Sequence, residues 1–361
     1  MKKTMIFFLF VLLGVLLSGC NLASPNHRTE FEGTWKLLSK TSDRPPPIVP
    51  LETDLFFFNE NEGFTTNGLR IDRTADGGKE WTVVWQYENT GDPEFHSFAF
   101  DETKNVWGVG SRDRDGIRST DPDEKPRSAT VTRSKDKAKT WSQLEIDFGD
   151  EREFLTESVT FWDICFTSSD SAWIASNIGL VQATVREESV KVENVVRTEE
   201  ELRRVSCWST GRVVIAIGNS AVYRYDGRGL SRLSTPSEFT FSKVKQLDGH
   251  IWMLGHKMLY PNSNSVATGL TGIVLASPDG GATWENRTPK EIRFFSDIDF
   301  RKGKGWLTGS DGSLFYSNDN GKSWHHVPVP TTHDLYSIFY LNEQNIWISG
   351  LNSTILKYGV D

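Results

Sequence analysis

A nine-residue pattern recurs four times along this chain, in residues 73–81, 133–141, 276–284 and 316–324. Each copy has an aspartate five residues before a tryptophan, in the pairs Asp76/Trp81, Asp136/Trp141, Asp279/Trp284 and Asp319/Trp324. Two residues after the aspartate stands Gly78, Gly281 or Gly321, with Ala138 in the second copy. An aspartate can accept hydrogen bonds from the backbone of a tight turn, and glycine permits the positive φ that such a turn needs. The pattern predicts a hairpin whose returning strand begins at the tryptophan, and its recurrence predicts a fold built from repeats.

A second pattern places apolar side chains at offsets 0, 3 and 5 of a strand. Clear copies start at Phe95, Phe161, Leu202, Phe295 and Leu335, and weaker copies start at Leu55 and Phe241. Each copy is followed by a strand that ends in a small residue and by a third strand. A fourth strand follows the aspartate turn in four units and is less distinct near Val190 and Leu230. Four short strands per unit, in seven units, predict an all-β fold: a seven-bladed β-propeller of four-stranded antiparallel blades.

The two ends of the chain predict how the ring closes. The seventh unit has three strands before Asp361, and residues 34–38 resemble an isolated fourth strand that is headed by Trp35. We expect this strand to complete the last blade, which leaves the ring without an open joint. The expected organisation is a signal peptide in residues 1–19, a tether in residues 20–31 and a propeller in residues 32–361.

The first twenty residues predict export and a lipid anchor. Lys2 and Lys3 precede an apolar run that ends in Leu17-Ser18-Gly19-Cys20, which resembles the lipobox of bacterial lipoproteins. The resemblance implies cleavage before Cys20 and acylation of that residue, with palmitate among the attached lipids, on the non-cytoplasmic side of a membrane. An ordinary secretory signal is the alternative. Asn21 favours the outer membrane if the cell is Gram-negative.

Charge and cysteine usage narrow the function classes. The formal net charge of −8 and the lack of a basic cluster argue against nucleic-acid binding. Cys165 and Cys207 remain once Cys20 is acylated, and they occupy different positions in their repeats. We therefore expect two small buried thiols, with a disulfide as the alternative in an exported protein.

The aspartate turn resembles the Asp box, or BNR repeat, of sialidases, other glycoside hydrolases and several non-enzymatic propellers. Residues 295–324, FSDIDFRKGKGWLTGSDGSLFYSNDNGKSW, are similar to the photosystem II stability and assembly factor-like propellers. This resemblance implies the propeller fold and a scaffold-like role. It does not identify the partner.

No catalytic, metal-binding or cofactor-binding constellation emerges from the sequence. A sialidase needs three arginines from different blades, but only Arg203 and Arg204 occupy innermost-strand positions, and both lie in one blade. His325 and His326 are adjacent on a strand, so they face opposite sides and cannot bind one ion. We therefore expect a protein that is not an enzyme and that uses no metal or cofactor.

Offset 2 of the innermost strands places four charged residues at one level of the predicted central channel: Asp163, Arg204, Lys243 and Asp297. We favour a set of ion pairs that neutralise one another in the channel. The alternative is a polar socket for a small ligand or a peptide terminus.

Both long insertions, residues 111–127 and 261–272, connect second to third strands and therefore share one rim. The first insertion carries the basic residues Arg112, Arg114, Arg118 and Arg127 as candidate partner contacts. Acidic residues balance them, so a solvated flexible loop is the alternative.

Together these features favour a lipid-anchored, monomeric, non-enzymatic propeller that contacts a protein or cell-envelope component through the inserted rim, in the manner of a scaffold for membrane-complex assembly. The alternative is a glycan-binding propeller or a sialidase-like glycoside hydrolase.

The anchor can be tested by replacing Cys20 with Ser. The variant cannot be acylated, so it should move from the detergent phase to the aqueous phase when cell extracts are partitioned. Unchanged partitioning would contradict the lipid anchor.

Overall fold

The computed structural model describes residues 33–39, 54–88, 92–113, 127–149, 158–208, 214–218, 220–259, 269–290 and 294–359. The described residues belong to one compact unit that begins at Gly33. The predicted signal peptide and the lipid-bearing tether lie outside these ranges. No helix within them is long and apolar enough to cross a membrane.

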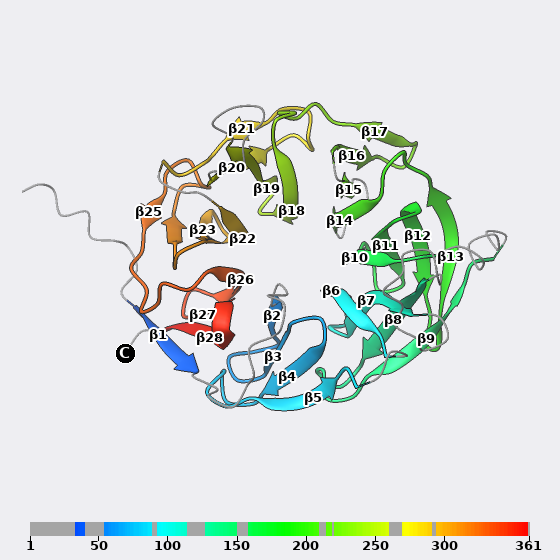
Figure 1. The fold of residues 1–361 in the computed structure, drawn as a ribbon, viewed down its shortest axis with the longest axis horizontal. Helices are drawn as coiled ribbons and strands as arrows, with labels where there is room; N and C mark the ends of the chain where they lie inside the picture. The colour runs from blue at the N-terminus through cyan, green and yellow to red at the C-terminus, as the bar shows by residue number, and fades with distance from the viewer. Residues whose placement is uncertain are drawn as a thin grey trace, which may run out of the picture. The chain divides into compact units, whose positions relative to one another are not determined.

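β-Sheets follow one another around a ring (Figure 1), and consecutive strands within a repeat pair antiparallel from the innermost strand outward. Five of the sheets have four strands. The first contains β2 (Asp54–Phe57), β3 (Gly63–Thr66), β4 (Arg70–Thr74) and β5 (Thr82–Gln86). The second contains β14 (Leu202–Cys207), β15 (Val214–Gly218), β16 (Val222–Tyr225) and β17 (Leu230–Arg232).

The third and fourth of these sheets carry the Asp-box turns that match the sequence pattern best. One contains β18 (Thr240–Leu247), β19 (His250–Leu259), β20 (Gly269–Ser277) and β21 (Glu285–Asn286). The other contains β22 (Phe295–Arg301), β23 (Lys304–Gly309), β24 (Leu314–Ser317) and β25 (His325–His326). The fifth contains β26 (Leu335–Asn342), β27 (Asn345–Gly350), β28 (Thr354–Gly359) and β1 (Thr34–Ser39).

The prediction of seven separate blades is wrong, because the remaining eight strands form a single sheet. One half contains β6 (Glu94–Phe100), β7 (Val106–Asp113), β8 (Arg127–Ser134) and β9 (Ser142–Asp147). The other half contains β10 (Phe161–Phe166), β11 (Ser171–Ser176), β12 (Gly179–Val185) and β13 (Ser189–Val196). Residues 189–191 of β13 pair in parallel with residues 145–147 of β9. These outer strands have six and eight residues, whereas β21 and β25 have two each, so only the longer strands meet.

The prediction that each returning strand begins at the Asp-box tryptophan is also wrong, by one residue. The outermost strands β5, β9, β21 and β25 start directly after the four tryptophans, which are Trp81, Trp141, Trp284 and Trp324. The physical reason is that each indole ring lies back over its own turn. A Cβ atom on Gly78, Gly281 or Gly321 would lie 3.5, 3.6 or 3.1 Å from the indole of the same turn. The chain therefore joins the sheet only at the next residue.

A β-bulge explains the spacing of apolar residues in the innermost strands. The register of β10 shifts between Phe161 and Asp163, which leaves Trp162 outside the pairing with β11. The same shift occurs at the start of β6, β14, β18, β22 and β26. Side chains alternate along a regular strand, so residues at offsets 0 and 3 would face opposite sides. One extra residue between them returns both to the same side.

The core lies between neighbouring sheets and is rich in tryptophan. Second-strand tryptophans are almost fully buried: Trp107, Trp252, Trp306 and Trp347 are each at most 2% exposed. Trp347 stacks on Phe57 with ring centroids 3.7 Å apart, and Trp252 stacks on Phe300 at 4.4 Å. Each contact joins one sheet to the next, because adjacent sheets bury their apolar faces against each other.

The expected closure by an N-terminal strand is confirmed. β1 pairs antiparallel with β28, with Trp35 opposite Tyr358. Trp35 is 8% exposed, and its ring meets the edge of Trp306 at 5.3 Å in the neighbouring sheet. The outermost strand of the last sheet thus comes from the other end of the described chain.

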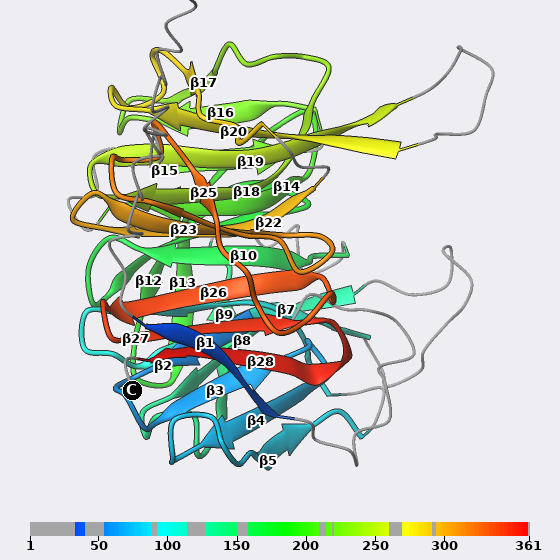
Figure 2. The ribbon, with the colours of Figure 1, turned by 90° about the vertical axis from the view of Figure 1, so that its left-hand side faces the viewer.

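The two rims of the ring differ. The Asp-box rim carries the turns at residues 75–80, 135–140, 278–283 and 318–323, together with the first-to-second strand turns. The inserted rim is the opposite one, where the β7–β8 and β19–β20 connections leave. In Figure 2 the β19–β20 ribbon projects to the right from this rim.

The closure predicts a large effect of Trp35→Ala on stability. Removing an indole buried between two sheets should lower the free energy of unfolding by about 3–5 kcal/mol, measured by denaturant unfolding. Removal of residues 21–31 alone is the control and should leave stability unchanged. Equal effects of the two changes would contradict closure by β1.

Candidate functional site

Each Asp-box aspartate accepts hydrogen bonds from the turn that follows it. Asp319 Oδ1 accepts from the Ser323 backbone N–H at 2.9 Å, and its Oδ2 accepts from Ser323 Oγ at 2.6 Å. Ser317 Oγ donates to Asp319 at 2.8 Å and accepts from the Gly321 N–H at 2.8 Å. The corresponding contacts recur around Asp76, Asp136 and Asp279. The carboxylates therefore hold the backbone of the turns.

The second Asp box adopts the same backbone without glycine. Gly78, Gly281 and Gly321 have φ between 70° and 97°, and Ala138 has φ of 62° at the equivalent position. A Cβ atom in this region costs roughly 1–2 kcal/mol. The Ala138 methyl group is fully buried in an apolar cluster, which offsets part of that cost.

The Asp-box tryptophans pack the turns onto the sheets. All four indoles are half-buried: Trp81, Trp141, Trp284 and Trp324. The first donates from Nε1 to Gly78 O of its own turn at 3.0 Å. The last donates from Nε1 to Arg287 O of the preceding sheet at 2.7 Å. The second and third make no such hydrogen bond, so only the packing of the ring is common to all four. These side chains have a structural role rather than a place in a ligand site.

The hydrogen bonds keep the Asp-box carboxyls ionised. Donation from Thr283 and Ser277 lowers the pKa of Asp279 to about 2. Burial raises the pKa of Asp76, Asp136 and Asp319, but the hydrogen bonds of each turn outweigh burial, so the pKa of each stays below its ordinary value. Groups that are ionised at every physiological pH and already engaged by the turn are poorly suited to proton transfer.

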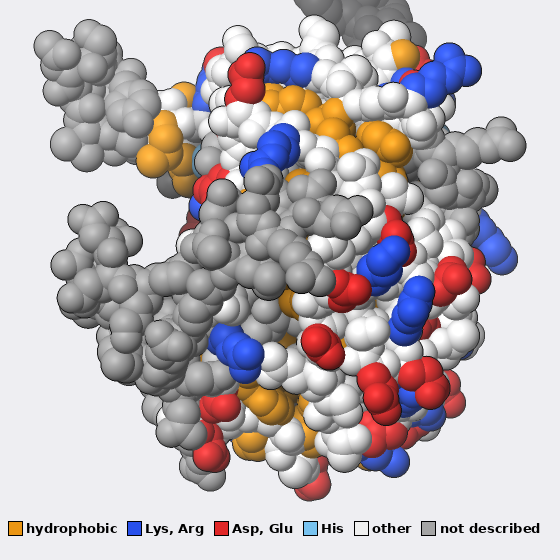
Figure 3. Space-filling view, turned by 90° about the vertical axis from the view of Figure 1, so that its right-hand side faces the viewer, with side chains coloured by type: hydrophobic (Ala, Val, Ile, Leu, Met, Phe, Trp, Pro, Cys, Tyr) orange, Lys and Arg blue, Asp and Glu red, His pale blue; other side chains and the backbone are white. Residues whose placement is uncertain are grey.

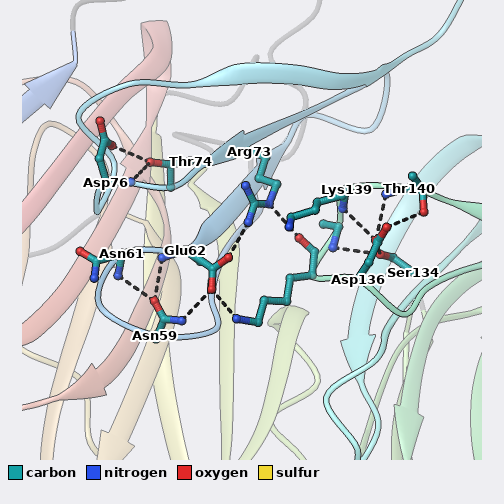
Figure 4. A network of polar contacts seen from close by, with 12 residues as sticks. Asn59, Asn61, Glu62, Arg73, Thr74, Asp76, Ser134, Asp136, Lys139 and Thr140 are labelled. Atoms are coloured by element: carbon teal, nitrogen blue, oxygen red, sulfur yellow. Dashed lines mark hydrogen bonds and ion pairs between the residues drawn. The ribbon is translucent and has the colours of Figure 1, made fainter.

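The Asp-box rim also joins neighbouring sheets, as Figure 4 shows for the turns around Asp76 and Asp136. Arg73 Nε on β4 donates to the backbone oxygen of Lys137 at 3.1 Å, and its Nη2 pairs with Glu62 at 2.7 Å. Lys137 completes the triad with an ion pair to the same Glu62. Elsewhere, Trp347 Nε1 donates to Gly77 O at 2.9 Å. The contacts to Lys137 and Gly77 each reach from one sheet into the turn of the next, so this rim connects neighbouring sheets.

Asp297, a candidate channel residue, is buried and paired. It is 1% exposed, and its Oδ1 lies 2.7 Å from Lys245 Nζ and 3.8 Å from Lys243 Nζ. Its Oδ2 accepts the backbone N–H of Ile338, in the next innermost strand, at 3.1 Å. Burial raises the pKa of Asp297, but the two ammonium groups together with the hydrogen bonds hold it below the ordinary value. Around Asp297, the structure therefore contains ion pairs of the kind that we expected from the sequence.

Asp163 occupies the equivalent place in β10, with different neighbours. Its Oδ1 accepts from Ser97 Oγ at 2.5 Å, and its Oδ2 accepts from the Val205 N–H of the next innermost strand at 3.0 Å. Arg204 Nη1 donates to the backbone oxygen of Arg203 at 3.0 Å. The four candidate channel residues therefore do not form one continuous ring of ion pairs.

Hydrogen bonds from the backbone of one innermost strand to side chains of the previous one occur at regular positions. A side chain at offset 2 accepts from the backbone N–H at offset 3 of the next strand, as Asp163 and Asp297 do. A side chain at offset 4 reaches offset 5: Ser206 Oγ accepts from Gln246 N at 3.1 Å, and Asp299 accepts from Tyr340 N at 3.0 Å. An innermost strand has an unpaired edge, and these contacts satisfy its donors.

The expectation of two buried thiols is wrong, because Cys165 and Cys207 form a disulfide. Both residues are half-buried, and their Cα atoms are 5.9 Å apart. Cys165 is at offset 4 and Cys207 at offset 5, which are the positions that meet across two neighbouring innermost strands. The difference in position, from which free thiols were expected, is what allows the two cysteines of neighbouring repeats to pair.

The residues displaced by the bulges form a stack on three consecutive innermost strands. His96 stacks on Trp162 with ring centroids 4.4 Å apart, and the Arg203 guanidinium lies 3.9 Å from the centre of the indole ring. His96 Nδ1 lies 2.8 Å from Phe161 O, and Arg203 pairs with Glu201. The sequence pattern does not reveal this stack, because the displaced position follows no apolar periodicity.

The inserted rim presents the start of both insertions. β7 and β8 pair as far as Asp113 and Arg127, and β19 and β20 pair as far as Leu259 and Gly269. Met258 and Leu259 are 50% and 42% exposed, and Arg112 is also exposed. Arg114 and Arg118 lie outside the described residues, as does the side chain of Arg127, so these candidates stay predictions.

The described residues do not assemble a metal centre or a sialidase-like site. Within those ranges no group of three or more His, Cys, Asp or Glu side chains could hold a metal ion. His325 and His326 are both exposed on β25. Arg203 and Arg204 both lie on β14. Figure 3 shows acidic and basic side chains interspersed over the side of the ring that it presents.

The ion pairs of Asp297 predict a large cost for Asp297→Asn. The change leaves two lysines facing an uncharged group, so the free energy of unfolding at pH 8 should fall by about 3 kcal/mol, measured by denaturant unfolding. Because the pKa of Asp297 is lowered, its contribution is present above the ordinary pKa of 3.8 and is lost as the pH falls through the lowered pKa. The deficit should therefore shrink in acid.

Asp299→Asn on the same strand is the matched control. Burial raises the pKa of Asp299 to about 6 despite the opposing charge of Lys245, so its ionised form is disfavoured. Loss of that charge should cost less than about 1 kcal/mol at pH 8. Equal losses in the two variants would contradict a special role for the Asp297 ion pairs.

Comparison with known protein families identifies one segment of the chain. Residues 258–334 match the family described as photosynthesis system II assembly factor YCF48. The photosystem II assembly lipoprotein Ycf48 of Synechococcus sp. (strain CC9902) is 35% identical over 66 residues, which are 17% of this chain and 20% of that protein. The chloroplastic photosystem II stability/assembly factor HCF136 of Arabidopsis thaliana is 32% identical over 73 residues, 19% of this chain and 18% of that protein. The matches thus span about a fifth of these relatives.

Solved structures share the fold over most of the chain. YCF48 bound to D1 peptide has a TM-score of 0.60 at 18% identity, covering 91% of this chain and 97% of that one. YCF48 from Cyanidioschyzon merolae has a TM-score of 0.59 at 19% identity, covering 90% and 99%. The extracellular domain of the one component system BT4673 from B. thetaiotaomicron has a TM-score of 0.61 at 10% identity, covering 90% and 42%.

These comparisons decide several sequence-based predictions. The curated relatives carry the names of assembly factors rather than enzymes, in agreement with a non-enzymatic protein. Nothing in them supports the preference for an outer membrane that was drawn from Asn21. The resemblance carried by the Asp boxes is confirmed: residues 258–334 match the photosystem II assembly factor family, and the propeller fold is shared over most of the chain.

Proposed function

We propose that this protein is a membrane-anchored, non-enzymatic propeller that binds a protein segment through its inserted rim and serves the assembly of a membrane complex. Acylation of Cys20 would supply the anchor, and a relative that is named a lipoprotein supports it. The ring would act as a rigid support that presents loops to the partner.

The observation that carries this proposal is the pair of ribbons on the inserted rim. β7–β8 and β19–β20 both extend past the start of their innermost strands, which pair only from Ser111 and His256 inward. The β19–β20 ribbon carries the exposed Met258 and Leu259. Exposed apolar side chains on a projecting ribbon are typical of contact surfaces rather than of a closed core.

The class of partner follows from the relatives. A solved YCF48 structure holds a D1 peptide, so we infer that the partner of this chain is also a polypeptide segment. The Cys165–Cys207 disulfide supports a location outside the cytoplasm, because disulfides persist in oxidising compartments.

We also infer that the ring consists of seven repeat units. In this interpretation the eight-stranded sheet counts as two blades, β6–β9 and β10–β13, joined at their outer strands. The offset rule supports it, since Ser97 of β6 reaches Asp163 of β10 as one blade reaches the next. Glycan binding, the alternative drawn from the sequence, gains no specific support from the described residues.

Substitution of the ribbon tests the contact surface. Met258→Asp and Leu259→Asp should abolish crosslinks between the intact protein and its partner in its own cells, because a charge cannot enter an apolar contact. Val83→Asp is the control. Val83 is 40% exposed on the outermost strand β5, away from the inserted rim, so its replacement should preserve the crosslinks. Preserved crosslinks in the ribbon variants would refute the proposed surface.

A further inference from the structure

The path of β1 determines the rim at which the described chain begins. Thr34 pairs with Gly359, at the end of β28, and Ser39 pairs with Ile355, near its start. β28 follows a second-to-third connection, so it runs from the inserted rim to the Asp-box rim. Antiparallel pairing then places Thr34 at the Asp-box rim (Figure 2).

The point of exit is held firmly in place. The Gly33 N–H donates to Tyr358 Oη at 2.9 Å, directly before the strand begins. Trp35 is buried two residues later between Trp306 and Tyr358. The chain is therefore attached to the Asp-box rim from Gly33 onward.

The distance from this point to the predicted lipid is short compared with the height of the ring. Twelve residues lie between Cys20 and Gly33, and thirteen Cα-to-Cα steps of a random chain span about 20 Å on average. β19 has ten residues and spans about 33 Å from the Asp-box rim to the end of its ribbon. If the inserted rim lay on the bilayer, the tether would have to run along the whole height of the ring. Its fully extended length is about 45 Å, so it would be stretched close to that limit.

The Asp-box rim itself suits a position beside lipid headgroups without insertion. Among the described residues, the exposed large apolar side chains are Leu37, Val83, Met258 and Leu259, and none lies in an Asp-box turn. The first-to-second strand turns on the same rim present ion pairs, such as the pair between Lys304 and Glu343. The described part of this rim therefore presents a polar surface to the headgroups.

We propose that the ring stands with its Asp-box rim toward the membrane and its inserted rim away from it. The inference rests on the proposed acylation of Cys20 and on the proposed partner surface. Its consequence is a narrower class of partner: a hydrophilic polypeptide segment that extends into the aqueous compartment by about the height of the ring, rather than a segment lying in the bilayer surface.

Energy transfer to a labelled membrane tests this orientation. The full acylated chain is bound to vesicles that contain an acceptor dye on the lipid headgroups. A donor is carried by a noncanonical amino acid in place of Lys322, exposed on the Asp-box rim, or in place of Met258 on the inserted rim. Energy transfer to the membrane dye should be several-fold stronger from the donor at position 322 than from the donor at position 258. Equal transfer, or stronger transfer from position 258, would overturn the proposal.

A second arm separates orientation from acylation. A histidine tag in place of Cys20 attaches the chain to nickel-chelating lipids along the same path, so the order of transfer should persist. A tag inserted within residues 261–267 should reverse the order, which shows that the measurement reads orientation. If the natural chain fails to bind vesicles, the anchor is refuted while the tagged chain still decides the orientation.

Discussion

The free edge of every innermost strand has to be satisfied at the centre of the ring, and the rest of the structure depends on how this is done. A strand that begins a sheet has hydrogen-bonding groups with no partner on one side. Asp163, Asp297 and Asp299 accept from the edge of the next innermost strand, and Ser206 does the same with a hydroxyl. The disulfide replaces such a contact between β10 and β14. Charged residues at the axis thus serve chiefly to connect sheets.

The two rims of the ring have different structural properties. On the Asp-box rim, each turn is held by its own aspartate, and three of the four accept a hydrogen bond from the preceding sheet, as the Lys137 backbone oxygen accepts from Arg73. That rim has little freedom to vary. The inserted rim carries ribbons that extend past the innermost strands, and loops on a rigid support tolerate added residues. The same repeat therefore combines a rigid seam at one end with a surface that tolerates elaboration at the other.

The sequence similarity to assembly factors is confined to one segment of the chain, whereas the fold is shared over most of it. The match in residues 258–334 covers the end of β19, strands β20 and β21, and the whole β22–β25 sheet, together with the last two Asp boxes. The solved relatives share the fold over 90% or more of the chain at under 20% identity. Turn chemistry and buried faces therefore suffice to specify the ring at this low sequence identity.

The sequence by itself determined the local elements and the closure. The Asp–Gly–Trp spacing specifies a hairpin because the side chain and the positive φ act within a few residues, and Trp35 marks a fourth strand that only the last sheet lacks. Even here the packing of each Asp-box indole over its turn delays the returning strand by one residue. The tertiary structure decided what depends on two repeats meeting: the joining of β9 to β13, the bond between Cys165 and Cys207, and the different partners of Asp163 and Asp297. The physical reason is that neighbouring sheets meet through opposite faces. Residues of different offset then become neighbours, and a repeat alignment compares only equal offsets.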